Sequence, residues 1–324
     1  MPKVSIVVPI YGVEKYIERC AISLFSQTLE DIEFIFVNDC TTDSSIEILN
    51  NVILKYPHRK NQVKIINLIK NQGLPNARKI GVESATGEYI IHCDSDDWVD
   101  VRAYQMLYEK AISGNYDMVF CNYYTSDGHV HRSIIQDFKR ITSSNILLNI
   151  VKHHLWSVWR VLVKREIYLN NIFYPRDNNG EDFALISQLI YFSKSFSYVN
   201  TPLYYYYYNE NSITKTCGIE KIKDRINQQC ENTKLVENFF NKHGKYDSYF
   251  NEIFILKLYC RANYSKYINE DEIREIWFNT FPEIDKHKIL FNKNIPFNLK
   301  VNYYSVRTGT YMFLKKLQSL IKSN

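Results

Sequence analysis

The chain has 324 residues, of which 45% are hydrophobic and 23% are charged, and its formal net charge at pH 7 is +5. This composition is typical of a folded soluble protein, and the length allows one large domain with an extension, or two domains. The positive charge is mild and diffuse, so we expect no nucleic-acid partner. Aromatic residues reach 15%, which suits the binding of sugars and nucleobases but also the filling of a core.

The cysteines predict neither a zinc site nor a disulfide framework, because they are scattered, odd in number and never form a CxxC pair. They are Cys20, Cys40, Cys93, Cys121, Cys217, Cys230 and Cys260. No uncharged apolar run approaches the ~18 residues of a membrane span. The N-terminal MPKVSIVVPIYG is interrupted by Pro9 and too short for a signal peptide core. We therefore expect a cytoplasmic protein with reduced, buried thiols.

The first hundred residues alternate between two hydrophobic patterns. Continuous apolar, β-branched runs predict strands that are buried on both faces, at residues 4–10, 33–37, 63–68 and 89–93. Apolar residues at helical spacing predict helices between them, around residues 17–25, 46–53 and 74–85. Such a βαβα order implies a mainly parallel sheet with right-handed crossovers, flanked by helices.

The pattern changes after residue 100. We predict a helix over 101–113, a hairpin of strands 118–125 and 130–135 around Ser126-Asp127-Gly128, a strand at 159–164 and a helix after Gly180. From about residue 219 the periodicity is helical throughout, over residues 222–240, 249–264 and 270–278. We expect an α/β body over 1–215 and an all-helical extension over 216–324.

Polar residues follow three of the predicted strands. Pro9-Ile10-Tyr11 ends the first, Asn38-Asp39 ends the second, and Asp94-Ser95-Asp96-Asp97 ends the fourth. Ligands of open parallel sheets bind beyond the carboxyl ends of the strands. Each segment alone could be an ordinary turn, but the agreement of three predicts a ligand site at this edge of the sheet.

The acidic segment favours a metal-bound diphosphate as that ligand. The chain contains neither GxGxxG nor GxxxxGK[ST], so no glycine-rich loop cradles phosphates. A divalent cation can instead bridge phosphate oxygens to one or two carboxylates, and Mg²⁺ and Mn²⁺ prefer oxygen ligands. Asp94 and Asp96 point the same way in an extended segment. The alternative is a solvated acidic turn that caps the helix near Val101.

Four segments together resemble the family-2 glycosyltransferases with the GT-A fold, over residues 3 to about 215. They are SIVVPIYGVEKYIERCAISLFSQTLEDIEFIFVNDCTTDSS, the N-x-G-x-x-x-A-R pattern from Asn71 to Arg78, ATGEYI at 85–90, and DSDD. The resemblance implies that Pro9 and Tyr11 shape a nucleotide pocket. It also implies that Asp39 bonds the edge of uracil or another pyrimidine, and that Asn71 and Arg78 line the nucleotide site.

The resemblance assigns separate roles within the DSDD segment, which contains the family's DxD motif. Asp94 is expected near the ribose and as a second metal ligand, Asp96 on the Mn²⁺ or Mg²⁺ ion, and Ser95 in the same substrate-binding turn. Asp97 either supports that turn or faces the sugar. One departure is Asn38, where many members carry a further Asp; we expect the base contact of the neighbouring aspartate to survive.

Gly180-Glu181-Asp182-Phe183 resembles the family's Glu-Asp motif, whose Asp is the catalytic base. An acceptor hydroxyl must lose a proton as it attacks the anomeric carbon, and a positioned carboxylate can take it. A single displacement inverts the configuration. We therefore expect Asp182 to be the base, with Glu181 as a supporting or acceptor contact. The alternative is that both acids merely suit the first turn of a helix.

Two further segments resemble the family less closely. Trp156, Trp159 and Arg160 stand where the family often has an aromatic and a basic residue, although core packing explains them equally well. Tyr204–Tyr208 with 209–214 resembles the family's closing stretch, but Tyr207-Tyr208 stands where many members carry a basic residue.

The C-terminal run YMFLKKLQSLIK at 311–322 has the pattern of a basic amphipathic helix. It could rest on an anionic membrane at the inner face of the cell membrane, where a lipid-linked acceptor would lie. It could equally pack its apolar stripe on the protein.

The sequence thus predicts an inverting, metal-dependent hexosyltransferase that moves sugar from a UDP-sugar or related nucleotide sugar to a glycan or lipid-linked glycan hydroxyl, in capsular or other surface polysaccharide synthesis. A sugar nucleotidyltransferase would need a glycine-rich basic loop after the first strand. A non-catalytic nucleotide-sugar or glycan-binding module is expected to lack the acids, yet Asp96 and Asp182 are present.

Overall fold

The computed structural model describes residues 1–135, 145–208 and 218–322. It divides into two compact units, one made of Met1–Ile146 and Trp156–Thr216, the other of Leu147–Leu155 and Cys217–Asn324. Residues 147–155 therefore group with the C-terminal unit. The domain boundary after residue 215 stays a prediction.

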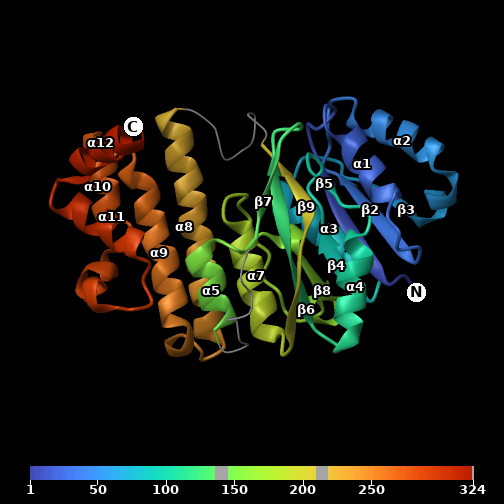
Figure 1. Ribbon diagram of the computed structural model, residues 1–324. Coiled ribbons are helices and arrows are strands. Elements are labelled where there is room, and N and C mark those ends of the chain that lie inside the picture. The colour runs from blue at the N-terminus through green and yellow to red at the C-terminus, as the bar shows by residue number, and fades with distance from the viewer. Residues whose placement is uncertain (136–144, 209–217, 323–324) are drawn as a thin grey trace. The chain divides into compact units, whose positions relative to one another are not determined.

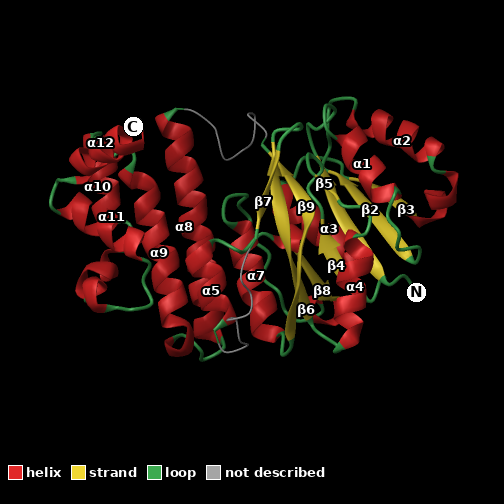
Figure 2. Cartoon of the chain, in the orientation of Figure 1, coloured by secondary structure: helices red, strands yellow, loops and turns green. Residues whose placement is uncertain are grey.

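The first unit is built on one mixed sheet (Figure 2), with strand order β3-β2-β1-β4-β8-β6-β9-β5 and with β7 paired to β6. Its strands are β1 (Val4–Ile10), β2 (Ile32–Asn38), β3 (Val63–Asn67), β4 (Tyr89–His92), β5 (Trp98–Val99), β6 (Met118–Ser126), β7 (His131–Ile134), β8 (Val161–Lys164) and β9 (Phe196–Tyr207). The pairs among β3, β2, β1 and β4 are parallel, whereas β8 runs antiparallel to both β4 and β6.

Helices cover both faces of this sheet. They are α1 (Ile17–Phe25), α2 (Ser45–Lys55), α3 (Leu74–Glu83), α4 (Ala103–Ser113), α6 (Arg165–Tyr168) and α7 (Glu181–Phe192). Alternate residues of β1 from Val4 to Ile10 share one apolar core with α1, α2 and α4. On the other face α3 packs so closely that a Cβ at Gly81 would strike the Val7 side chain. The α/β fold predicted from the sequence is confirmed.

The predicted elements of the first 135 residues are also confirmed, with ends that differ by a few residues. The sequence analysis did not predict β9. This strand carries Pro202, which pairs with Asn122 at a bulge in the β6–β9 ladder, and its burial does not alternate cleanly. A proline within a run and a mixed exposure pattern hide a strand from period-2 reasoning. Residues 159 and 160, predicted as the start of a strand, instead belong to the 3₁₀ turn Val158–Arg160 before β8.

The second unit is helical (Figure 1). It contains most of α5 (Ile146–His153), then α8 (Ile219–Lys242), α9 (Phe250–Ser265), α10 (Asp271–Asn279), α11 (Phe297–Arg307) and α12 (Tyr311–Lys322). The three helices predicted between 222 and 278 are confirmed, whereas α5 and α11 were not predicted. Helix α9 is buried almost all round and lies at the centre of this core. Within the described ranges, no helix has the length and apolar character needed to cross a bilayer.

Candidate active site

A cavity of about 1070 Å³ opens in the first unit beyond the carboxyl ends of β1, β2 and β4. Its lining includes most of the predicted site residues: Pro9, Tyr11, Asp39, Asn71, Arg78, Asp94, Ser95, Asp96, Glu181 and Asp182. Further along the sheet the lining becomes aromatic, with Tyr123, Trp156, Trp159 and Tyr206. The strand ends therefore converge as expected, while the roles of the individual residues stay predictions.

Asp39 shapes the β2 side of the cavity. Its carboxylate is buried and accepts hydrogen bonds from the backbone N–H groups of Gln72, at 2.7 Å, and Gly73, at 2.8 Å. Gly73 has a φ of 85° at the start of α3, a conformation that favours glycine. Asp39 thereby fixes the turn that presents the exposed Asn71 beside the cavity.

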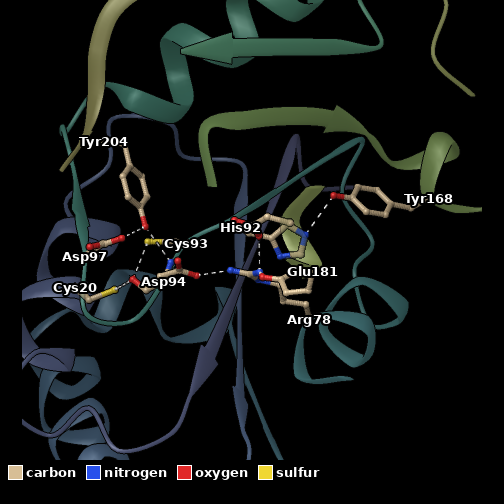
Figure 3. A network of polar contacts seen from close by, with 10 residues as sticks. Cys20, Arg78, His92, Cys93, Asp94, Asp97, Tyr168, Glu181 and Tyr204 are labelled. Atoms are coloured by element: carbon tan, nitrogen blue, oxygen red, sulfur yellow. Dashed lines mark hydrogen bonds and ion pairs between the residues drawn. The ribbon is translucent and has the colours of Figure 1, made fainter. Parts of the chain in front are cut away.

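Arg78 joins the acidic segment after β4 to the Glu181-Asp182 pair, which follows much later in the sequence. Its guanidinium, 1% exposed, donates to Asp94 Oδ1 at 2.7 Å, to Asp182 Oδ1 at 2.8 Å and to Glu181 Oε1. Figure 3 shows the Arg78 guanidinium between Asp94 and Glu181. Arg78 therefore lies at the cavity wall together with these acids, and it holds the DSDD turn and the start of α7 together.

This cluster contains more negative than positive charge. Three carboxylates share one buried guanidinium, so their mutual repulsion is only partly offset. Burial raises the pKa of Asp182 to about 6, with Arg78 opposing the shift and Asp94 adding to it. The Asp182 side chain keeps 23% of its surface exposed. A carboxylate with a pKa near neutrality that faces a cavity can accept a proton from a bound hydroxyl group.

The backbone at Gly180 aims this carboxylate. Gly180 has a φ of 82°, in the left-handed region, and a Cβ there would collide with the Phe183 ring. Helix α7 therefore begins sharply at Glu181, which is buried, while Asp182 reaches the cavity. Both carboxylates also lie at the positive end of the helix dipole.

The DSDD turn is held from behind by β9. Tyr204 donates its hydroxyl to Asp97 Oδ2 at 2.6 Å and accepts the N–H of Asp94 at 3.1 Å. The Tyr207 N–H donates to Asp97 Oδ1 at 2.6 Å. Asp97 is 1% exposed, does not line the cavity, and has its pKa raised well above the usual range by burial and by the nearby Asp96 and Asp94. Of its two predicted positions, the geometry favours support of the turn.

Asp94 and Asp96 suit a divalent cation that also binds phosphate. Both line the cavity and both are partly exposed. In the part of the chain that the structure describes, no three His, Cys, Asp or Glu side chains form a cage for a metal. Mg²⁺ and Mn²⁺ commonly use one or two carboxylates with water and substrate phosphate, so this donor set fits such an ion.

Sequence comparison identifies the family. The model of glycosyl transferase family 2 matches residues 5–188. The chain belongs to glycosyl transferase family 2. The Bacillus subtilis protein named uncharacterized glycosyltransferase EpsJ is 32% identical over 75% of this chain and 71% of its own length. Hyaluronan synthase of Pasteurella multocida is 25% identical over the full chain, which spans 31% of that longer enzyme.

Solved structures with the same fold agree with this family. S. aureus TarS 1-349, in complex with UDP-GlcNAc, superposes with a TM-score of 0.64 at 18% identity; the match covers 95% of this chain and 88% of that 1-349 chain. The mannosyltransferase PcManGT of Pyrobaculum calidifontis, in complex with GDP-Man and Mn²⁺, has a TM-score of 0.56 at 12% identity and covers 95% of this chain and 87% of its own. These likenesses establish the GT-A fold of this family-2 glycosyltransferase.

The contacts of Trp156, Trp159 and Arg160 differ in this glycosyltransferase. Arg160 is buried and donates from Nε and Nη2 to the Cys121 carbonyl, so it is a structural residue outside the cavity. Trp159 stacks on Tyr204 at 4.1 Å between ring centroids and also lines the cavity, whereas Trp156 lines it with an edge contact to Phe183. The predicted closing stretch at 209–214 lies outside the described residues.

Arg19 of α1 contacts the acidic turn, a contact that was not predicted from the sequence. Its Nη2 donates to the carbonyl oxygen of Asp96 at 2.9 Å, and its guanidinium lies 3.7 Å from the Trp98 ring centroid and 4.5 Å from that of Tyr207. Arg19 thus places a cation against Tyr207, which stands where many family members carry a basic residue. An arginine on an amphipathic helix carries no sequence signal for such a contact.

Proposed function

We propose that this family-2 glycosyltransferase moves a sugar from a UDP-sugar, or a related nucleotide sugar, to a hydroxyl of a glycan with inversion of configuration. The observation that carries the proposal is the buried bridge in which Arg78 binds the DxD aspartate Asp94 together with Glu181 and Asp182. The bridge fixes a candidate base at a set position relative to the turn that would hold the donor diphosphate.

Asp182 is the proposed base. Its carboxylate takes the acceptor proton as the hydroxyl attacks the anomeric carbon, and Arg78, which also binds Glu181, holds that carboxylate in place. One displacement with no carboxylate nucleophile inverts the anomeric centre. A Mn²⁺ or Mg²⁺ ion held by Asp96, with Asp94 beside it, would stabilise negative charge on the departing diphosphate.

Donor and acceptor occupy different parts of the cavity in this proposal. Pro9, Tyr11, Asp39 and Asn71 surround the nucleotide at the β1–β2 side, and Ser95 lies in the diphosphate turn. The acceptor glycan, free or linked to lipid, enters beside Asp182. The relationship to hyaluronan synthase supports surface polysaccharide synthesis as the setting. We expect the enzyme in the cytoplasm, with α12 as a possible contact to the inner face of the membrane.

A panel of UDP- and GDP-sugars tests the proposal. Release of the nucleoside diphosphate should occur with one donor, should require Mn²⁺ or Mg²⁺, and should stop with a chelator. Binding of a donor without turnover under every condition would support the alternative, a non-catalytic nucleotide-sugar-binding module. If no donor is bound or hydrolysed, the proposed function is wrong.

A further inference from the structure

The C-terminal part of the helical unit differs in charge from the rest of the chain. Residues 286–324 contain no Asp or Glu and eight basic residues: Lys286, Lys288, Lys293, Lys300, Arg307, Lys315, Lys316 and Lys322. All 35 acidic residues of the chain lie before residue 286, together with 32 of the 40 basic ones. The whole excess of positive charge therefore comes from this segment, since the first 285 residues have a net charge of −3.

The same segment exposes large apolar side chains. Phe291 is 77% exposed, Phe297 80% and Phe313 65%, and Leu290 and Met312 are also exposed. Among the described phenylalanines that are more than a third exposed, only Phe173 lies elsewhere. Isolated exposed apolar residues are ordinary in globular proteins, but a group of them beside basic residues marks an interaction surface.

Contacts place several of these residues on one face. Helix α11 buries Leu299, Tyr303 and Val306 in the helical core, which leaves Phe297 and Tyr304 outward. Lys300 lies between them on the same helical face, and its Nζ donates to the Leu290 carbonyl at 2.9 Å. The 3₁₀ turn Ile289–Phe291 therefore adjoins α11, so basic and apolar side chains alternate across this surface.

We propose that the surface formed by Leu290, Phe291, Lys293, Phe297 and Lys300, continued by α12, binds the face of an anionic lipid bilayer. Lysines attract anionic headgroups and exposed phenylalanine and leucine side chains enter the boundary with the acyl chains. A polyanion such as nucleic acid would be attracted by the charges but would leave Leu290 and Met312 without a partner. The proposal differs from binding by the terminal helix alone, because it includes α11 and the turn before it (Figure 1).

Co-sedimentation of the full chain with vesicles tests this surface. Phosphatidylcholine vesicles containing phosphatidylglycerol should bind the protein, pure phosphatidylcholine should bind it weakly, and salt should reduce the binding. Phe291→Ser with Phe297→Ser, and separately Lys293→Glu with Lys300→Glu, should each lower partitioning by about tenfold or more. Leu54→Ser with Leu169→Ser removes equally exposed leucines from the other unit and should have no effect.

Three results would overturn the proposal: equal binding to neutral and anionic vesicles, equal loss in the control variant, or retention by a heparin column with no vesicle binding at all. Loss of binding only on truncation before Tyr311, with both double variants unaffected, would confine the contact to α12. The measurement needs no turnover, so its outcome is independent of the proposed transferase reaction. Circular dichroism of each variant checks that the helices remain folded.

Discussion

Two buried arginines, Arg78 in the α/β unit and Arg261 in the helical unit, are both 1% exposed but differ in their surroundings. Arg261 binds one carboxylate, Asp285, through both Nη atoms at 2.7 and 3.3 Å. Its other donors meet backbone carbonyls, and its guanidinium lies 4.7 Å from the centroid of the Trp277 ring. Asp285 also pairs with Arg307 at 2.9 Å, so this site has no excess of negative charge.

Arg78, by contrast, shares its charge among three carboxylates, and its buried Nε has no hydrogen-bond partner within the described residues. An excess of carboxylates around a buried cation is unfavourable for stability alone. In the proposed function, a divalent cation at Asp96 and Asp94 would supply the missing positive charge. The comparison separates an arginine in a core from one that binds the proposed catalytic base.

We expect the largest effect on kcat from a change at Asp182, the proposed base. Asp182→Asn keeps an oxygen to accept the Arg78 hydrogen bond but cannot take a proton. It should lower kcat by roughly 10²- to 10⁴-fold, with the donor Kd nearly unchanged in calorimetry. The matched variant Asp285→Asn should leave kcat of the folded protein intact. Retained turnover by Asp182→Asn would remove this residue from the base role.

The second prediction concerns Arg261, where we expect a loss of stability and no loss of activity. Arg261→Met leaves Asp285 without its buried partner and should lower the free energy of unfolding by about 3–5 kcal/mol. Denaturant unfolding followed by the fluorescence of tryptophan, including the adjacent Trp277, measures the loss. At low temperature, where the variant stays folded, its kcat should match the parent. A kcat that falls in proportion to the stability loss would contradict the distinction between the two sites.

The third prediction uses the pKa of Asp182. Because this carboxyl must be ionised to act as a base and has a pKa of about 6, kcat/KM should fall as the pH drops below about 6. Arg78 opposes the upward shift of this pKa, so Arg78→Gln should move the acid limb to higher pH, by about one pH unit.

Arg59 provides the control for that pH profile. It is also buried, but it donates to the carbonyls of Phe25, Gln27 and Leu29. Arg59→Gln should reduce stability without moving the acid limb. Identical profiles for the parent and the Arg78 variant would separate Arg78 from the titration of the base.

The smallest effect is expected at Arg19, which touches the acidic turn through a backbone carbonyl and two aromatic rings. Arg19→Gln should raise the KM for the donor by roughly fivefold, the equivalent of about 1 kcal/mol, with a smaller change in kcat. Arg19→Lys should recover part of this loss. Lys55→Gln, at an exposed position, is the control and should change neither constant. If kcat of Arg19→Gln fell by as large a factor as its KM rose, general misfolding would be the better explanation.

Local patterns predicted most of the framework. The runs at 4–10 and 89–92 form β1 and β4 because each is apolar on both faces, and Asp94 and Asp96 after β4 line the cavity. What the sequence did not predict depends on contacts between distant residues: the β9 tyrosines under Asp97, Arg19 on the Asp96 carbonyl, and the Arg78 bridge to Glu181. Arg78 was expected at the nucleotide, and no periodicity indicates that it is buried among carboxylates.

The hydrogen bonds between Asp97 and β9 determine when the acidic turn can form during synthesis of the chain. The strands β1 to β4 are complete once His92 has been made, and the parallel pairings among them need no later residue. The acidic turn, however, waits for Tyr204 and Tyr207, more than a hundred residues later. A nascent chain released early would therefore have a formed parallel half-sheet but a loose acidic turn. The residues that hold the acidic turn would be made only after Asp182, the proposed base, is already in the chain.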